Sequence, residues 1–402
     1  MYRDIASNKH KFLEEVTFSQ SCGCQTARKC SIWALSCAFN SCSVLSMMAG
    51  VLCVVYLTCI VIETGVVADC AVSLQLPIRS GCNGADELCP RRYNEVAYAT
   101  LHNAFSTTQN GIFFAQHRSC MRSALMGGMR GFMLDVHLTT SNTLRLCHSF
   151  CWLGSVSLDD TLLMFKEFRE NNPREIVTIF IETGFDGRLT VDNSTKTTLS
   201  LLLKKSFELS GLVQFLFSHE SATKEWPSLS CMIAQDRQIV VFVDAGRFSD
   251  EGVAPWLHCT CLFVSQTKWN LKTPKQLSED CVFHRIWKKC RELSLINHFT
   301  IAGSLGINTG SLQWFAKLFS VSEIGNINHI PFLQDRVLSC SKCSGRFINF
   351  VAVDFWESSD VLKLVETINT KSTIQTSYPH HPDVAFCNNH TNTKVAERCF
   401  IS

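Results

Sequence analysis

From residue 95 onward, short apolar runs rich in β-formers alternate with longer amphipathic segments. A short apolar run of four to eight residues predicts a buried strand, and apolar residues every three to four positions predict a helix. Eight strands are expected, at residues 95–101, 131–138, 144–148, 176–182, 239–244, 262–266, 293–299 and 347–355. Helices are clearest at residues 157–172, 278–294 and 358–369. Ser157 is the expected N-cap of the first, and Pro173 lies beyond its end.

This alternation predicts an α/β protein with a parallel sheet. Eight strands within about 280 residues favour a TIM-type (β/α)8 barrel. The alternative is a doubly wound open sheet, which usually has fewer strands. No glycine-rich phosphate turn follows the first strand, as such a sheet would favour.

Polar side chains end nearly every predicted strand. Catalytic groups of (β/α)8 barrels lie at the C-terminal strand ends, so these side chains are expected to meet at one mouth. A single histidine at a strand end is usually structural, but convergence of several ends favours a functional site. The polar ends are His102 with Asn103, Asp135 with His137, His148, Glu182, Asp244, Gln266, Asn297 with His298, and Asp354.

The residue types at this mouth restrict the chemistry. Histidines titrate near neutral pH, so one can accept a proton while another donates one. Amide and carboxylate oxygens suit Ca²⁺ or Mg²⁺ rather than zinc. The sequence contains no serine nucleophile elbow, HExxH motif or Walker loop. Its net charge of +2 is too small to indicate a nucleic-acid partner.

The N-terminal region predicts a membrane anchor. Residues 31–62 contain no charged side chain, and residues 44–62 form a long apolar run. Arg28 and Lys29 precede it, which places residues 1–43 in the cytosol and residues 70–402 in the lumen or outside. A buried core helix is one alternative. A cleaved signal peptide, which would give a secreted protein, is another, although the segment before the run is unusually long.

The region after the anchor is expected to consist of a lead-in at 70–92, the barrel at 93–370 and a tail at 371–402. Asn193 and Asn389 lie in glycosylation triplets. The chain has 22 cysteines, several of them in the cytosolic segment, and the later ones suit an oxidising compartment. Cys82 with Cys89, and Cys147 with Cys151, are close enough in sequence to form disulfides.

Several segments resemble the phosphatidylinositol-specific phospholipase C X-domain family, with the closest likeness to its secreted or membrane-attached, X-domain-only branch. The resemblance spans about residues 82–369. The segments are CNGADELCPRRYNEVAYATLHNAFS, GGMRGFMLDVH, LCHSFC, NPREIVTIFIE, LINHF and NFVAVDFWESSDVLKLVETIN.

The resemblance implies a TIM-type barrel in which an inositol hydroxyl attacks the adjacent phosphodiester. His102 resembles the first catalytic histidine, and His148 resembles the second, which protonates the leaving oxygen. Asn103, Asp135 and Glu182 match metal-ligand positions of calcium-dependent members, so a divalent cation is expected, with Ca²⁺ favoured over Mg²⁺.

The chain departs from that pattern at Met133, where calcium-dependent members carry a carboxylate. A thioether is a poor ligand for a hard cation. Six further residues are candidates for substrate contact or support. These are Arg130 (equally a structural ion-pair partner), His137, Asp244, Trp269, His298 and Asp354, the last of which could orient His102.

The sequence thus predicts a membrane-anchored phosphodiesterase acting on an inositol phospholipid or glycosylated inositol lipid, with a membrane phospholipid or glycolipid as partner. One alternative is a barrel that binds a headgroup or a protein without turnover. Another is hydrolysis of glycerophosphodiesters.

Overall fold

The computed structural model describes residues 72–77, 81–112, 115–148, 150–186, 191–219, 224–244, 254–283, 293–301 and 326–370. All of them belong to one compact unit, Val67–Ser402. The predicted cytosolic segment, the span at 44–62, the tail and Asn389 lie outside the described residues. Among the helices that are described, none has the length and apolar character needed to cross a bilayer.

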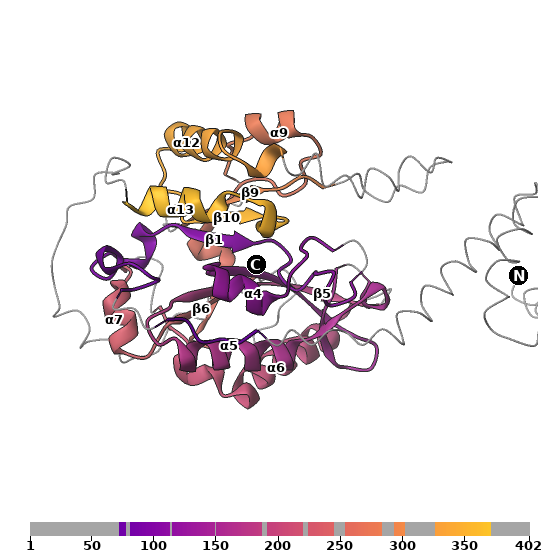
Figure 1. Cartoon of the computed structure of the whole chain (residues 1–402). Coiled ribbons are helices and arrows are strands. Elements are labelled where there is room, and N and C mark those ends of the chain that lie inside the picture. Colours follow the sequence, from indigo (N-terminus) through magenta and orange to yellow (C-terminus); the bar gives the residue numbers. More distant parts are fainter. Residues whose placement is uncertain are drawn as a thin grey trace, which may run out of the picture. The chain divides into compact units, whose positions relative to one another are not determined.

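Eight parallel strands form the centre of this unit (Figure 1). Their hydrogen-bonded order is β7-β6-β5-β2-β1-β10-β9-β8. Chain order therefore proceeds round the sheet without reversal, as in a (β/α)8 barrel, whereas a doubly wound sheet changes direction. The strands are β1 Tyr98–Leu101, β2 Gly131–Leu138, β5 Val177–Phe185, β6 Ile239–Val243, β7 Leu257–Cys259, β8 Val264–Gln266, β9 Leu293–His298 and β10 Phe350–Val353.

The α/β prediction is confirmed, with one departure from a closed barrel. No ladder joins β7 to β8 in the described part of the chain, so the sheet is open at this seam. The single turn α8 (Thr260–Phe263) connects the two strands directly. β7 has no counterpart among the predicted strands, because its three residues form too short an apolar run to detect.

The predicted barrel strand at 144–148 is wrong. β3 (Leu144–Leu146) pairs antiparallel with β2 and with β4 (Val156–Ser157), so it belongs to a hairpin attached to the barrel. Thr139 N–H donates to Thr143 O at 2.9 Å in the tight turn before β3. Five residues between β2 and β3 are too few for a parallel crossover, which needs about a dozen or more.

Helices cover the outer face of the strands. The predicted N-cap is confirmed: Ser157 Oγ accepts a hydrogen bond from Asp160 N–H, and α5 begins at the next residue. The predicted helix at 358–369 is also confirmed, as α13. The helix predicted at 278–294 is wrong at its start, because α9 ends at Glu279 and residues 280–283 are not helical.

Figure 1 shows α12 beside α9, and α13 beside β1 and β10. The larger helices are α4 Met121–Gly127, α5 Leu158–Asn171, α6 Asn193–Ser210, α7 Leu229–Ala234, α9 Pro274–Glu279, α12 Phe332–Ser344 and α13 Val361–Thr370. Short 3₁₀ turns lie at Asp86–Leu88, Tyr93–Glu95, Cys151–Leu153, Leu212–Phe215 and Trp356–Ser358. Asn193 is exposed in the first turn of α6, so its glycosylation remains a prediction at an accessible position.

Strand alternation separates two apolar layers. The outward residues pack under the helices, as Leu134 and Ile181 do. The inward residues form an aromatic cluster in which Phe180 lies 5.3 Å from Phe242 and 4.9 Å from Phe350 between ring centroids. This cluster closes the barrel interior below the C-terminal strand ends. The inward residues beyond it therefore face the mouth.

The two predicted disulfides, Cys82–Cys89 and Cys147–Cys151, are confirmed. Other disulfides were not predicted. Among the described residues, Cys259–Cys261 joins the end of β7 to α8, and Cys281–Cys340 ties the segment after α9 to α12.

Arg130 belongs to the opposite end of β2 from the mouth. Its guanidinium donates to Glu175 Oε2, with N–O distances of 2.8 and 2.7 Å, and Nη1 also donates to the Leu125 and Met129 carbonyls. The guanidinium carbon lies 5.1 Å from the centre of the Phe168 ring. Of the two readings of Arg130, the structure supports the ion pair.

Glu175→Ala should lower the free energy of unfolding by about 3–5 kcal/mol, because it leaves the buried Arg130 charge without its partner. The exposed Arg122–Glu167 pair, at 2.8 Å, provides the control. Glu167→Ala should cost less than about 1 kcal/mol. Urea unfolding of both variants measures the difference, and equal losses would contradict a structural role for Arg130.

Candidate active site at the mouth of the barrel

His102 and Asp354 form the central pair of the mouth. Each follows the last residue of a strand, and those residues, Leu101 and Val353, are register partners in β1 and β10. His102 N–H donates to Val353 O at 3.1 Å, which extends the pairing by one residue. The imidazole Nδ1 lies 2.9 Å from Asp354 Oδ1. The contact predicted between Asp354 and His102 is therefore present.

The Phe299 ring fixes the plane of the His102 ring. Phe299 directly follows β9, and its ring stacks on the His102 ring with centroids 3.7 Å apart and planes within 6° of parallel. A carboxylate on Nδ1 favours the tautomer in which that nitrogen carries the proton, so Nε2 becomes the basic atom. Nε2 points toward Asn103.

Asn103 lies between His102 and Asp135. Its backbone has a φ of 45°, in the left-handed region that asparagine tolerates better than most residues. Its side-chain nitrogen donates to the two Asp135 oxygens at 3.2 and 3.1 Å, and its oxygen accepts from Gln116 Nε2 at 3.2 Å. The same oxygen lies 3.3 Å from His102 Nε2, which donates to it when both nitrogens of the imidazole are protonated.

Asp135 and Glu182 are register partners on the parallel strands β2 and β5. Because neighbouring strands lie about 4.8 Å apart, the two side chains are neighbours on the same face of the sheet. Burial, and then the negative charge of Glu182, raise the pKa of Asp135 to about 7, while His102 opposes this shift. Met133, two residues earlier, packs with the interior apolar cluster and is the register partner of Phe180.

His148 reaches the site from the β3–β4 hairpin and not from a barrel strand. Its side chain is exposed at the rim. Desolvation of the imidazole by the surrounding protein lowers the pKa of His148, and the charge of His102 lowers that pKa further. The negative charge of Asp354 acts in the opposite direction and raises it. These interactions place His148 within electrostatic range of the His102–Asp354 pair.

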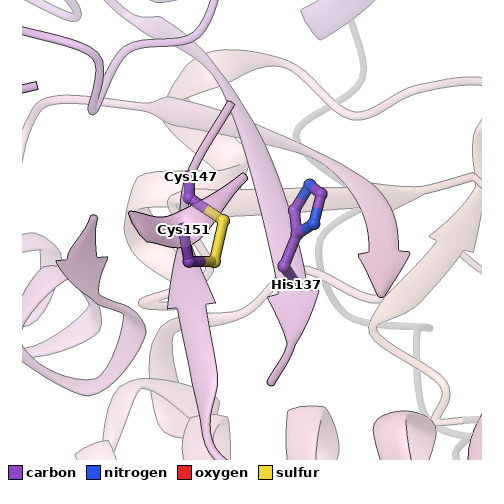
Figure 2. Close-up of side chains that lie close together, drawn as sticks. All are labelled: His137, Cys147 and Cys151. Carbon is purple, nitrogen blue, oxygen red and sulfur yellow. A yellow bond between two sulfur atoms is a disulfide. The ribbon is translucent and has the colours of Figure 1, made fainter. Parts of the chain in front are cut away.

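His137 packs against the hairpin, beside the Cys147–Cys151 disulfide (Figure 2). Asp244 is half-buried directly after β6, and its N–H donates to Ile181 O at 2.9 Å. Trp269 is exposed beyond the end of β8.

His298 lies on the opposite face of β9 from Asn297 and Phe299. Its Nε2 is 2.8 Å from Ile327 O, and its Nδ1 is 3.3 Å from Arg336 Nη1 under α12. Burial, and then the Arg336 charge, lower the pKa of His298 to about 3, so it is neutral. The structure does not bring this histidine to the mouth.

Three residues at the site have no counterpart in the sequence prediction. Phe299 and Gln116 are two of them, and the third is His117, which is buried with Nε2 2.7 Å from the His102 carbonyl oxygen. Phe299 follows Asn297 by two positions, so strand alternation could have revealed it. Gln116 and His117 lie in a loop without a periodic pattern, which gives no such signal.

The donor set fits a hard divalent cation. Asn103, Asp135 and Glu182 offer only oxygen atoms. The negative charge of Glu182 raises the pKa of Asp135, and a bound cation would relieve this repulsion between the two acids. The residues present fit Ca²⁺ or Mg²⁺.

Comparison with models of known protein families identifies the family of this chain. The family model described as PI-PLC X matches residues 88–369. The chain belongs to the PI-PLC X family. Two proteins of Arthroderma benhamiae are related to this chain at 25% identity. One is described as an uncharacterized secreted protein, and the other as PI-PLC X domain-containing protein 1. The matches cover 70% and 72% of this chain, and 61% and 89% of the two relatives.

Solved structures of PI-PLC proteins also match. A phosphatidylinositol-specific phospholipase C of Staphylococcus aureus matches with a TM-score of 0.45 at 12% identity, over 70% of this chain and 95% of its own. A calcium-dependent phosphoinositol-specific phospholipase C of Pseudomonas sp. matches with a TM-score of 0.35 at 11% identity, over 66% and 91%.

Asp135→Asn should stabilise the metal-free protein at pH 8 and leave it unchanged near pH 4. The raised pKa means that the folded state binds a proton that the unfolded state has lost, so wild-type stability falls as pH rises from about 4 through 7. Asparagine removes that loss of stability, and the gain should be on the order of a few kcal/mol, with about 4 kcal/mol as the upper bound set by the shift. Urea unfolding in chelator at both pH values measures it. A loss of stability at pH 8 would contradict the assigned environment of Asp135.

Proposed function

We propose that this chain is a phosphodiesterase of the phospholipase C type, which cleaves an inositol phospholipid or a glycosylated inositol lipid. The observation that supports this function most strongly is the arrangement of His102. Its Nδ1 contacts Asp354 while Nε2 points to Asn103 and, beyond it, Asp135. A barrel that only bound a headgroup would not need an imidazole oriented by a buried carboxylate.

His102 serves as the general base in this proposal. Its Nε2 takes the proton from an inositol hydroxyl, whose oxygen then attacks the neighbouring phosphorus. Asp354 stabilises the imidazolium that forms, because it accepts the hydrogen bond from Nδ1–H. Stacking on Phe299 keeps the ring in place during the transfer.

His148 serves as the general acid. It gives a proton to the lipid alcohol oxygen as the phosphorus–oxygen bond breaks, so the products are a cyclic inositol phosphate and the free lipid alcohol. Its lowered pKa makes the imidazolium a stronger acid than an ordinary histidine. The protonated His102 then gives its proton to the departing inositol oxygen when water opens the cyclic phosphate, or releases it to solvent.

Asn103, Asp135 and Glu182 would hold the divalent cation. When bound, the ion would supply positive charge to the phosphoryl oxygens, where negative charge develops. Met133 packs with the apolar interior, so the cation would depend on these three side chains, on water and on substrate oxygen. The lipid substrate also makes a membrane anchor or secretion to a membrane surface part of this proposal.

His102→Ala and His148→Ala should each lower kcat by about 10²-fold or more, because each removes one proton-transfer group. The assay uses the full chain with phosphatidylinositol, a glycosylated inositol lipid and glycerophosphoinositol, and ³¹P NMR identifies the cyclic product. His329 provides a matched control, since its Nδ1 contacts Asp360 at 3.1 Å in an exposed imidazole–carboxylate pair.

His329→Ala should leave kcat within about twofold of wild type, as expected for a surface substitution. Near-normal turnover by the His102 and His148 variants would exclude the proposed mechanism. Cleavage of glycerophosphoinositol alone, without a cyclic product, would instead indicate a glycerophosphodiester hydrolase.

Chelation should abolish most of the activity, and added Ca²⁺ should restore it, because the three oxygen side chains bind a cation weakly without substrate. Glu182→Gln should raise the Ca²⁺ concentration for half-maximal rate. Met133→Glu should lower that concentration, because alternation puts position 133 on the same face of β2 as Asp135. Full activity in chelator would show that Asp135 and Glu182 do not act through a metal.

A further inference from the structure

His148 is held by a different kind of structural element from the other catalytic candidates. His102 and Asp354 flank paired strands, and Asp135 and Glu182 lie within them. His148 instead follows a three-residue strand of the hairpin. A catalytic side chain on a loop needs other restraints, since small misplacements of a reacting group reduce the rate strongly.

The Cys147–Cys151 disulfide supplies the most direct restraint. It closes a ring of chain that includes His148, and its two cysteines are four positions apart in the sequence. Cys147 is fully buried, and its N–H donates to the Asp135 carbonyl oxygen at 3.2 Å. Cys151 N–H donates to Asp186 Oδ1 at 3.2 Å, just beyond the end of β5. The ring is thus fastened to β2 and to the end of β5.

The His137 side chain packs beside the disulfide (Figure 2). Its ring nitrogen lies within 4.8 Å of both sulfur atoms. The ring occupies the space over Gly184, its register partner on β5. A Cβ added to Gly184 would lie 2.6 Å from His137 Cε1, so glycine at this position makes room for the ring.

We propose that the Cys147–Cys151 disulfide, packed against His137 over Gly184, is the positioning element that holds His148 at the mouth beside His102. This inference rests on the proposed function of His148. A general stabilising role does not suit this disulfide, because one that closes a short loop constrains the unfolded chain least and so adds little stability. Cys281–Cys340 spans 59 positions and is better suited to that role.

The test compares two double variants of the full chain. C147S/C151S removes the proposed positioning element, and C82S/C89S removes a disulfide of similar loop length, seven positions, near the N-terminal end of β1. Serine variants are used in place of a reductant, because two free thiols beside His137 would form a ligand set for zinc.

C147S/C151S should lower kcat about tenfold or more, with KM within about twofold of wild type, since substrate binding does not need the acid in place. C82S/C89S should leave kcat nearly unchanged. Both should lower Tm by similar amounts. Equal effects of the two variants on kcat would overturn the proposal.

A second measurement separates this inference from the proposed function. In protein labelled with ¹⁵N-histidine, the order parameter of the His148 amide should fall from about 0.85 to below about 0.6 in C147S/C151S. The His148→Ala variant assigns the signal. Unchanged order would overturn the positioning role. If wild-type protein cleaves no inositol lipid, the proposed function fails, and the order parameter still decides whether the disulfide holds His148.

Gly184→Ala disturbs the same element without changing a sulfur atom. The new Cβ displaces the His137 ring, so kcat and the order of the His148 amide should both fall. Adding His137→Ala should leave both low, because the ring that packs beside the disulfide is then missing altogether. No change in Gly184→Ala would exclude His137 from the positioning element.

Discussion

The parallel pairing of β1 with β10 is the constraint on which the site depends. These strands join the two ends of the barrel sequence, and their register brings Leu101 beside Val353. The backbone hydrogen bonds between these strands therefore bring together His102 and Asp354, which are 252 positions apart. The aromatic cluster below them keeps the barrel interior filled, so the polar groups can gather only above it.

The mouth combines a favourable pair with an unfavourable one. His102 and Asp354 have opposite charges when the imidazole is protonated, and Phe299 restricts the ring further. Asp135 and Glu182, in contrast, are two acids side by side, and the pKa of Asp135 rises because the fold places it there. Such a cost in stability is typical of functional sites, where side chains are arranged for a ligand or reaction.

Much of the fold could be predicted from the sequence, because β-rich runs and their polar ends follow directly from strand alternation and burial. The error at residues 144–148 came from counting apolar runs without considering connection length. β7 could not be found, since three residues carry too little pattern. For His298, both faces of β9 carry apolar and polar residues, so the sequence could not show that it faces α12. The pairing of His102 with Asp354 needed the register of distant strands.

The left-handed backbone at Asn103 has a consequence for how the site is built. Successive side chains of an extended strand point to opposite faces. The φ of 45° at Asn103, directly after β1, breaks this alternation, so its amide lies within hydrogen-bonding distance of both Asp135 and the neighbouring His102. The turn that ends the strand therefore also lets two consecutive residues serve one site.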